Sequence, residues 1–145
     1  MGNTLPHLAS ADELDDFFSH AARTLIPNGV LILQILNYTD ILSRPDFRFP
    51  LIDTEHVTFS RSYSPREDGR LSFTIGVTEK SFGRTFSDTT TLLPVTADMI
   101  ASSCLKTGLG TPALYAGYDF SPGGGNEFAT LYVINGSRKG RNKNG

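Results

Sequence analysis

Polar residues that could hold a small ligand stand at two places near the start of the chain. Asn3 and His7 belong to the opening segment, and Asn37 and Tyr38 directly follow the apolar run Val30–Leu36. An amide side chain both donates and accepts hydrogen bonds, and a phenol does the same. A loop at the carboxyl end of a buried parallel strand lies where such sheets hold ligands. These residues are therefore candidates for orienting a bound molecule.

Arg61 and Tyr115 are further candidates for contact with a substrate, although each has a structural alternative. Arg61 stands on the otherwise apolar face of a predicted strand, where it meets an anionic substrate or lies along the edge of a hairpin. Tyr115 and Tyr118 either line a pocket for a substrate or pack against other aromatic residues. His7 is either a functional loop residue or a solvated histidine.

Other reactive residue types carry no catalytic arrangement. Cys104 is the single cysteine, and with no histidine near it in sequence it is expected to be a small core residue. The acidic cluster Asp12, Asp15 and Asp16 is interpreted as the solvated start of a helix, where negative charge is favourable, and not as a catalytic acid pair. No Cys/His pair has the spacing of metal ligands, so the sequence predicts no metal site and no catalytic residue.

Composition describes one domain without an evident macromolecular partner. The chain has 145 residues and a formal charge of −2, which gives no general attraction to nucleic acid or to anionic lipid. Its longest apolar run is far short of the roughly 20 residues that cross a bilayer. One cysteine and no export signal favour the cytoplasm. Residues 136–145 are basic and are expected to form a disordered, solubilising tail.

The first predicted elements are a helix and a strand. Ser10 and Glu13 form a capping box at the start of a helix, and a turn at residues 27–29 ends it. The apolar residues of this helix fall on one face, namely Leu14, Phe17, Phe18, Ala21 and Leu25. The run Val30–Leu36 is apolar on both alternating faces apart from Gln34, which predicts a central parallel strand that helices cover on both sides.

The rest of the chain predicts a small antiparallel sheet, a helix and two strands. Residues 56–77 alternate with period two around a turn at 65–69, and residues 82–91 are expected to add a third strand. Thr96 is expected to cap a short helix that ends before Gly108. Strands follow at residues 113–118 and 128–134, and the glycine-rich segment 121–126 between them is expected to be flexible.

The two ligand-binding segments resemble motifs of class I S-adenosylmethionine-dependent methyltransferases. In the branch that includes glycine and sarcosine N-methyltransferases, a motif is matched here by Gly2, Asn3, Thr4, His7 and Leu8, and a second motif by Asn37 and Tyr38. The resemblance implies an α/β fold with a partial Rossmann-like sheet. This part comprises the last three strands, at 30–36, 113–118 and 128–134, with flanking helices, and the last strand runs antiparallel between the other two. Residues 1–135 would then be the C-terminal part of a methyltransferase domain, with an antiparallel hairpin or meander inserted at about 44–92.

The resemblance also implies S-adenosylmethionine as cofactor and a small molecule as methyl acceptor, at nitrogen or oxygen. It places Gly2, Asn3 and His7 beside the cofactor and Asn37 and Tyr38 beside the acceptor. Arg61 and Tyr115 are added as substrate contacts. Leu36 occupies the position where the glycine and sarcosine enzymes carry a carboxylate-binding arginine, so a small amino acid does not fit as acceptor.

The glycine-rich cofactor loop of the family would lie upstream of Met1. Gly123–Gly125 does not replace this loop, because a strand follows it where a helix is required. The chain is therefore expected to be inactive alone, with an exposed edge on strand 30–36 that pairs with a missing N-terminal half or with itself. The alternative is a non-catalytic interaction module that binds a partner through the same edge.

Overall fold

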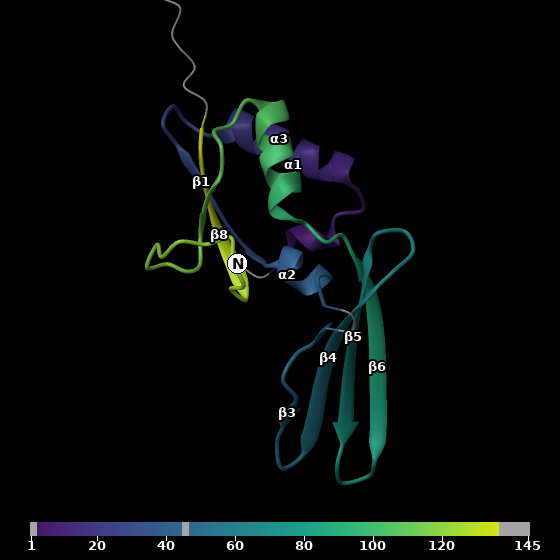
Figure 1. Ribbon diagram of the computed structural model, residues 1–145. Coiled ribbons are helices and arrows are strands. Elements are labelled where there is room, and N and C mark those ends of the chain that lie inside the picture. The colour runs from purple at the N-terminus through teal and green to yellow at the C-terminus, as the bar shows by residue number, and fades with distance from the viewer. Residues whose placement is uncertain (1–2, 45–46, 137–145) are drawn as a thin grey trace, which may run out of the picture. The chain divides into compact units, whose positions relative to one another are not determined.

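The computed structural model describes residues 3–44 and 47–136 and divides the chain into two compact units (Figure 1). Within the described residues, the first unit contains 3–37 and 95–136, and the second contains 38–94. Gly2 and residues 137–145 lie outside the described residues, and with them most of the predicted basic tail. No helix in the described part of the chain is long and apolar enough to cross a membrane.

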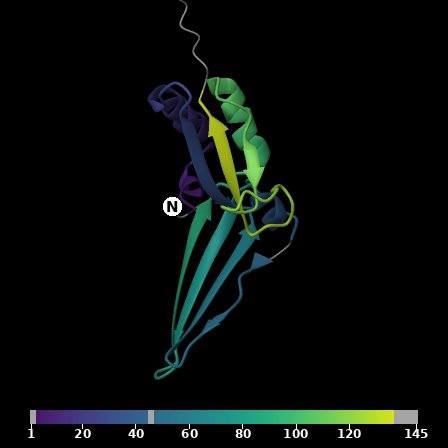
Figure 2. The same ribbon diagram turned by 90° about the vertical axis from the view of Figure 1, so that its left-hand side faces the viewer.

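The first unit contains a three-stranded sheet in which the last strand lies in the middle. The strands are β1 (Val30–Leu36), β7 (Ala113–Tyr115) and β8 (Ala129–Asn135), in the order β1-β8-β7. β8 runs antiparallel to both neighbours, as the views in Figures 1 and 2 show. This arrangement confirms the predicted sheet order, although β7 is shorter than the predicted strand at 113–118.

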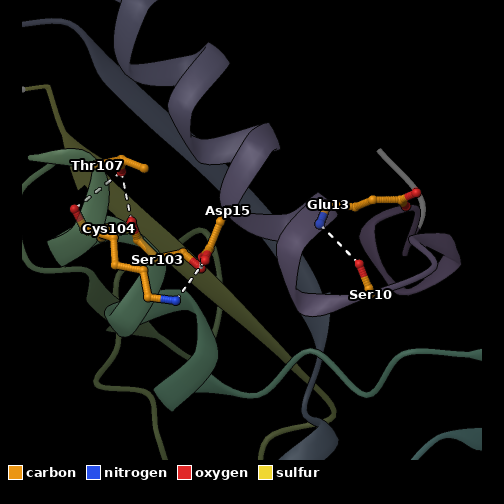
Figure 3. Close-up of polar contacts among 7 residues, drawn as sticks. Ser10, Glu13, Asp15, Ser103, Cys104 and Thr107 are labelled. Atoms are coloured by element: carbon orange, nitrogen blue, oxygen red, sulfur yellow. Dashed lines mark hydrogen bonds and ion pairs between the residues drawn. The ribbon is translucent and has the colours of Figure 1, made fainter.

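The helix α1 (Ala11–Thr24) begins at the predicted capping box. The Ser10 hydroxyl accepts a hydrogen bond from the Glu13 backbone N–H at 3.3 Å (Figure 3). The Glu13 carboxylate accepts one from the Ala9 N–H at 2.7 Å, so two N–H groups that the helix itself leaves unpaired are satisfied. Leu14 and Phe18, on the predicted apolar face, are fully buried.

The helix α3 (Ala97–Thr107) begins and ends where the sequence predicts, after Thr96 and before Gly108. The Thr96 hydroxyl accepts from the Met99 N–H at 3.4 Å. Gly108 ends the helix with φ of 74°, a left-handed conformation that glycine adopts without steric cost. A short 3₁₀ helix, η1 (Leu5–His7), precedes α1.

The prediction that helices cover both faces of β1 is wrong for this chain. Residues along β1 alternate in exposure: Val30 is 46% exposed and Ile32 is 53% exposed, whereas Ile35 is 3% exposed. The reason is that α1 and α3 pack against each other and lie on the same side of the sheet (Figures 1 and 2). The opposite face of β1 therefore presents its apolar side chains to solvent.

A polar clamp joins α1 to α3. The Asp15 carboxylate accepts hydrogen bonds from the Ser103 hydroxyl and from the Lys106 ammonium group, the latter at 2.7 Å (Figure 3). The hydrogen bond from Lys106, followed by that from Ser103, holds the pKa of Asp15 below its ordinary value. Asp15 thus has a partner on the second helix, Ser103, which lies 88 residues away in the chain. No local sequence pattern indicates this contact.

Asp15→Asn should lower the free energy of unfolding by about 1 kcal/mol, because an amide loses the ion pair with Lys106. The pKa of Asp15 is lowered in the folded state, so its stabilisation is present above the unfolded value of about 4 and is lost as the pH falls through the folded value. The difference between the wild type and the variant should therefore shrink on acidification, as measured by urea unfolding. Asp16→Asn, at an exposed position on the same turn, is the control and should change little.

The second unit is an antiparallel sheet preceded by the short helix α2 (Tyr38–Leu42). The sheet order is β2-β4-β5-β6, and β3 also pairs with β4. The strands are β2 (Phe47–Arg48), β3 (Ile52–Asp53), β4 (Val57–Pro65), β5 (Leu71–Glu79) and β6 (Arg84–Leu92). The predicted hairpin and third strand are confirmed. The segments α2, β2 and β3 were not predicted, because elements of two to five residues are too short to show a period.

The two faces of this sheet differ in chemistry. On β4, β5 and β6 one face consists of serine and threonine residues around Gly76, and hydroxyl pairs such as Thr74–Thr89 at 3.0 Å and Thr78–Thr85 at 3.2 Å join neighbouring strands. The other face carries the apolar and aromatic side chains, among them Tyr63 and Phe73. The predicted alternation therefore has one apolar side and one hydroxyl side.

Candidate functional site

Two of the predicted ligand-binding residues meet at the carboxyl end of β1. The Asn3 side-chain oxygen accepts a hydrogen bond from the Leu36 N–H at 3.2 Å. The next residue, Asn37, donates its backbone N–H to the Phe128 oxygen at 3.1 Å, which continues the antiparallel pairing beyond the last residue of β1 and before the first residue of β8. The opening segment and the end of the strand, 33 residues apart, thus lie together.

Asn37 also connects this end of the strand to the glycine-rich loop before β8. Its side chain is 7% exposed, and its Nδ2 donates to the Gly125 carbonyl oxygen at 2.9 Å. A buried amide that loses such a partner leaves an unsatisfied polar group. Asn37 therefore holds the loop in place, whatever else it binds.

The glycine-rich loop is organised around Glu127, a residue that no motif in the sequence indicates. The Glu127 carboxylate accepts from the Gly124 N–H at 2.8 Å, the Gly125 N–H at 2.9 Å and the Thr130 hydroxyl at 2.7 Å. Burial alone would raise the pKa of Glu127, but these hydrogen bonds outweigh it and the pKa lies below its ordinary value. The loop that was expected to be flexible is thus held by hydrogen bonds to the Glu127 carboxylate. The N–H groups of Gly124 and Gly125 donate to this carboxylate and not to a ligand.

The remaining candidates of the first unit occupy different environments. Tyr115 is half-buried and its ring meets that of Phe120 edge to face, with the centroids 5.1 Å apart. The Tyr118 hydroxyl donates to the Gln34 side chain at 3.3 Å. His7 is exposed at the end of η1. Tyr115 therefore takes part in aromatic packing, and contacts of Tyr115 and His7 with ligands remain predictions.

In the second unit, Tyr38 belongs to a cluster of buried phenols. Tyr38 is 1% exposed, its ring centroid lies 6.1 Å from that of Tyr63, and the two side chains share a hydrogen bond. Burial raises the pKa of Tyr63, although this hydrogen bond and the positive charge of Arg61 act in the opposite direction. The Tyr63 phenol therefore stays neutral at physiological pH and can act as a hydrogen-bonding group.

Arg61 lies close to the same cluster and stacks on aromatic rings. Its guanidinium carbon is 4.8 Å from the Phe49 ring centroid and 5.4 Å from that of Phe59. Among the described residues, its buried Nε has no hydrogen-bond partner. The side chain is thus placed by cation–π contacts, and a planar cation held in this way suits an anionic group.

Neither the single thiol nor any cluster of acidic, histidine and cysteine side chains in the described residues indicates a reactive centre. Cys104 is buried, and burial raises the pKa of its thiol to about 11, so the thiolate form is scarce at neutral pH. No group of three His, Cys, Asp or Glu side chains in the described ranges is placed to hold a metal ion.

The chain matches no protein family model and no curated protein sequence. Its fold is nevertheless similar to that of methyltransferases of known structure, one described as S-adenosylmethionine-dependent and another solved with S-adenosylmethionine bound. One is a methyltransferase from Clostridium acetobutylicum (TM-score 0.75, 15% identity, 94% of this chain and 56% of that chain covered). Another is CcbJ from Streptomyces caelestis (TM-score 0.77, 17% identity, 93% and 58% covered). A third is CalS10, an amino pentose methyltransferase from Micromonospora echinaspora (TM-score 0.63, 19% identity, 93% and 55% covered). The chain thus spans a little over half the length of these proteins.

Proposed function

We propose that this chain takes part in the transfer of a methyl group from S-adenosylmethionine to a small-molecule acceptor, as part of a methyltransferase domain. The observation that carries the proposal is the sheet order β1-β8-β7, with β8 antiparallel in the middle and Asn3 and Asn37 at the carboxyl end of β1. The similar structure of CalS10 was solved with S-adenosylmethionine bound, and its name describes a small acceptor, an amino pentose.

The proposed roles of the residues follow from what methyl transfer requires. The sulfonium group of the cofactor supplies an already activated methyl group, so the protein mainly aligns donor and acceptor in line. In this proposal Gly2, Asn3 and His7 face the cofactor. The acceptor is held by Asn37, Tyr38, Arg61 and Tyr115. No acid, base or nucleophile of this chain is assigned a catalytic step.

The residues present fit only one part of the cofactor site. Asn3 and Asn37 place amide groups at the carboxyl end of β1. In the glycine-rich loop 123–125, however, the N–H groups of Gly124 and Gly125 donate hydrogen bonds to the Glu127 carboxylate. We therefore propose that a second polypeptide segment supplies the remaining cofactor contacts and pairs along the free edge of β1. The chain alone is then inactive. With its single cysteine outside any disulfide, it works in the cytoplasm.

Calorimetry with S-adenosylmethionine tests this proposal. The purified chain should give no saturable heat of binding up to about 1 mM S-adenosylmethionine. A dissociation constant of about 1 mM corresponds to a binding free energy of roughly −4 kcal/mol. The chain co-expressed with the polypeptide encoded immediately upstream should bind one equivalent. In that complex, Asn3→Ala should weaken binding about tenfold, the loss of about 1.4 kcal/mol.

Two outcomes would contradict the proposal in different ways. Saturable one-to-one binding by the chain alone would show that the cofactor site does not need a second segment. An intact complex that neither binds S-adenosylmethionine nor transfers its methyl group would rule out the methyltransferase function. An upstream frame that encodes a strand, a glycine-rich turn and an acidic strand end is the first thing to look for.

The second candidate is a non-catalytic interaction module. It is favoured by the exposure of Val30 and Ile32 on β1, whose one strand partner in the described chain is β8. Exposed apolar residues on an edge strand are typical of a surface that pairs with another chain. A stop codon upstream, with no sequence for the missing strands nearby, would favour this module over the enzyme.

A further inference from the structure

The glycine-rich loop before β8 is held by two anchors of different chemistry. At its base, the Gly123 N–H donates to a carbonyl oxygen of β7 at 3.1 Å. Further along, the Gly124 N–H donates to Oε1 of Glu127 at 2.8 Å and the Gly125 N–H to Oε2 at 2.9 Å. The buried Thr130 hydroxyl, from β8 itself, holds the same carboxylate by donating to Oε1 at 2.7 Å. Glu127 therefore governs Gly124 and Gly125, but not the base of the loop.

Asn37 is held from two directions by different parts of the first unit. Its backbone N–H donates to the Phe128 oxygen at 3.1 Å, which belongs to the pairing of β1 with β8. Its side-chain Nδ2 donates to the Gly125 carbonyl oxygen at 2.9 Å. A carbonyl oxygen only accepts hydrogen bonds, so it can face only the nitrogen end of the Asn37 amide. The backbone of Asn37 thus depends on the strands, whereas the orientation of its side chain depends on Gly125.

Gly125 joins the two sets of contacts. Its N–H is held by Glu127, and its carbonyl oxygen accepts from Asn37. Glycine has the widest choice of backbone conformations, so the direction of this carbonyl depends on the hydrogen bonds around it. Asn37 is 7% exposed, so a turn of the carbonyl would take a partner from a buried amide. A change at Glu127 should therefore reach the Asn37 side chain through a single residue.

We propose that Glu127 is a positioning residue for Asn37: its carboxylate fixes Gly125, and the Gly125 carbonyl orients the Asn37 amide with Nδ2 toward the loop and Oδ1 away from it. The amide then meets a ligand with a fixed pattern of donor and acceptor. That this ligand is a methyl acceptor rests on the proposed function. The positioning itself does not, because every contact in it lies within the first unit.

NMR spectroscopy of the full chain tests the positioning with the variant Glu127→Gln. The glutamine keeps the length of the side chain but replaces one oxygen by an NH2 group. The best remaining arrangement leaves its oxygen with Gly124 and Thr130, so the NH2 group faces the Gly125 N–H and two donors oppose each other. Glu67→Gln makes the same charge change at an exposed turn and is the matched control.

Hydrogen exchange of the Gly125 amide should become about tenfold faster in Glu127→Gln, and the signals of the Asn37 side-chain NH2 group should shift. The Asn37 backbone N–H, which Phe128 holds, should exchange within about twofold of the wild-type rate. Glu67→Gln should match the wild type at all three groups. Unchanged Asn37 side-chain signals in Glu127→Gln, or equal acceleration of the Gly125 amide and the Asn37 backbone amide, would overturn the proposal.

A pH titration of the wild type provides a test that needs no variant. Burial raises the pKa of Glu127, but the hydrogen bonds outweigh it, so the carboxylate stays charged until the pH falls below the usual value of about 4.3. The titratable group that faces Glu127 in the described chain is Tyr132, a phenol that stays neutral in acid. The Asn37 side-chain signals should therefore move together with the Glu127 carboxyl carbon, while the Asn37 backbone signal stays in place.

Different titration midpoints for Asn37 and Glu127, or no movement of the Asn37 side-chain signals, would overturn the positioning role. Neither measurement uses S-adenosylmethionine or an acceptor, so their outcome is separate from that of the calorimetry. A positive NMR result with no cofactor binding by the complex would refute the methyltransferase proposal alone.

Discussion

Tyr63→Ala should lower the free energy of unfolding by about 3–5 kcal/mol, the range for removing a buried aromatic side chain. Tyr63 is 3% exposed, and its ring centroid lies within 5.0 to 6.2 Å of those of Phe73, Phe49 and Phe47 and 6.1 Å from that of Tyr38. The alanine would leave a cavity at the centre of the aromatic cluster, because four rings cannot all move to fill it. Urea unfolding followed by near-ultraviolet circular dichroism measures the loss.

Two further variants serve as controls for Tyr63→Ala. One removes an exposed ring elsewhere in the chain, and the other removes only the hydroxyl group of Tyr63. Phe82→Ala removes a ring that is 71% exposed and should change stability by less than about 0.5 kcal/mol. Tyr63→Phe keeps the ring and loses the hydrogen bond with Tyr38, at a cost of about 1 kcal/mol. Because the pKa of Tyr63 is raised on folding, its ionisation should destabilise the wild type above about pH 10, and this loss is absent from Tyr63→Phe. A Tyr63→Ala protein as stable as Phe82→Ala would contradict the assigned role of the cluster.

Gly123→Ala should destabilise the first unit by about 3 kcal/mol, because its methyl group has no space. A Cβ atom at position 123 would lie 2.5 Å from the carbonyl carbon of Tyr115 and 2.8 Å from its Cα and nitrogen. These are backbone atoms of β7, so relief requires the loop to move away from the strand. The displacement should also weaken the hydrogen bond from Asn37 to Gly125, two residues further along.

Gly125→Ala is the matched control in the same loop. Its added methyl group would come no closer than 3.7 Å to an atom beyond its chain neighbours, the Glu127 Oε2, which is an ordinary contact. Stability should then change by less than about 1 kcal/mol. Equal thermal shifts for the two variants would mean that the loop does not pack on Tyr115 as described.

Local features of the chain were predictable from sequence because their causes lie within a few residues. The Ser10 and Glu13 cap, the Thr96 cap and the Gly108 end each depend on neighbours at most four positions away. The hairpin of β4 and β5 follows from alternation and a five-residue turn between its strands. The sheet order β1-β8-β7 came from resemblance to a family, since no local pattern states which strand lies in the middle.

Long-range contacts were decided by the tertiary structure. Asn37 and Gly125 are 88 residues apart, as are Asp15 and Ser103, and no periodicity joins such positions. The role of Glu127 was hidden for a similar reason, because its significance depends on how the loop folds back over it.

The exposure of β1 shows this division most directly. By composition, the sequence determined an apolar strand suited to the inside of a sheet, and it determined the caps and turns that place helices before and after it. Only the tertiary structure decided that α1 and α3 both lie on one side, so that Val30 and Ile32 stay exposed. Apolar character is a property of single residues, whereas burial depends on what packs against them, and that is set by the whole arrangement of elements.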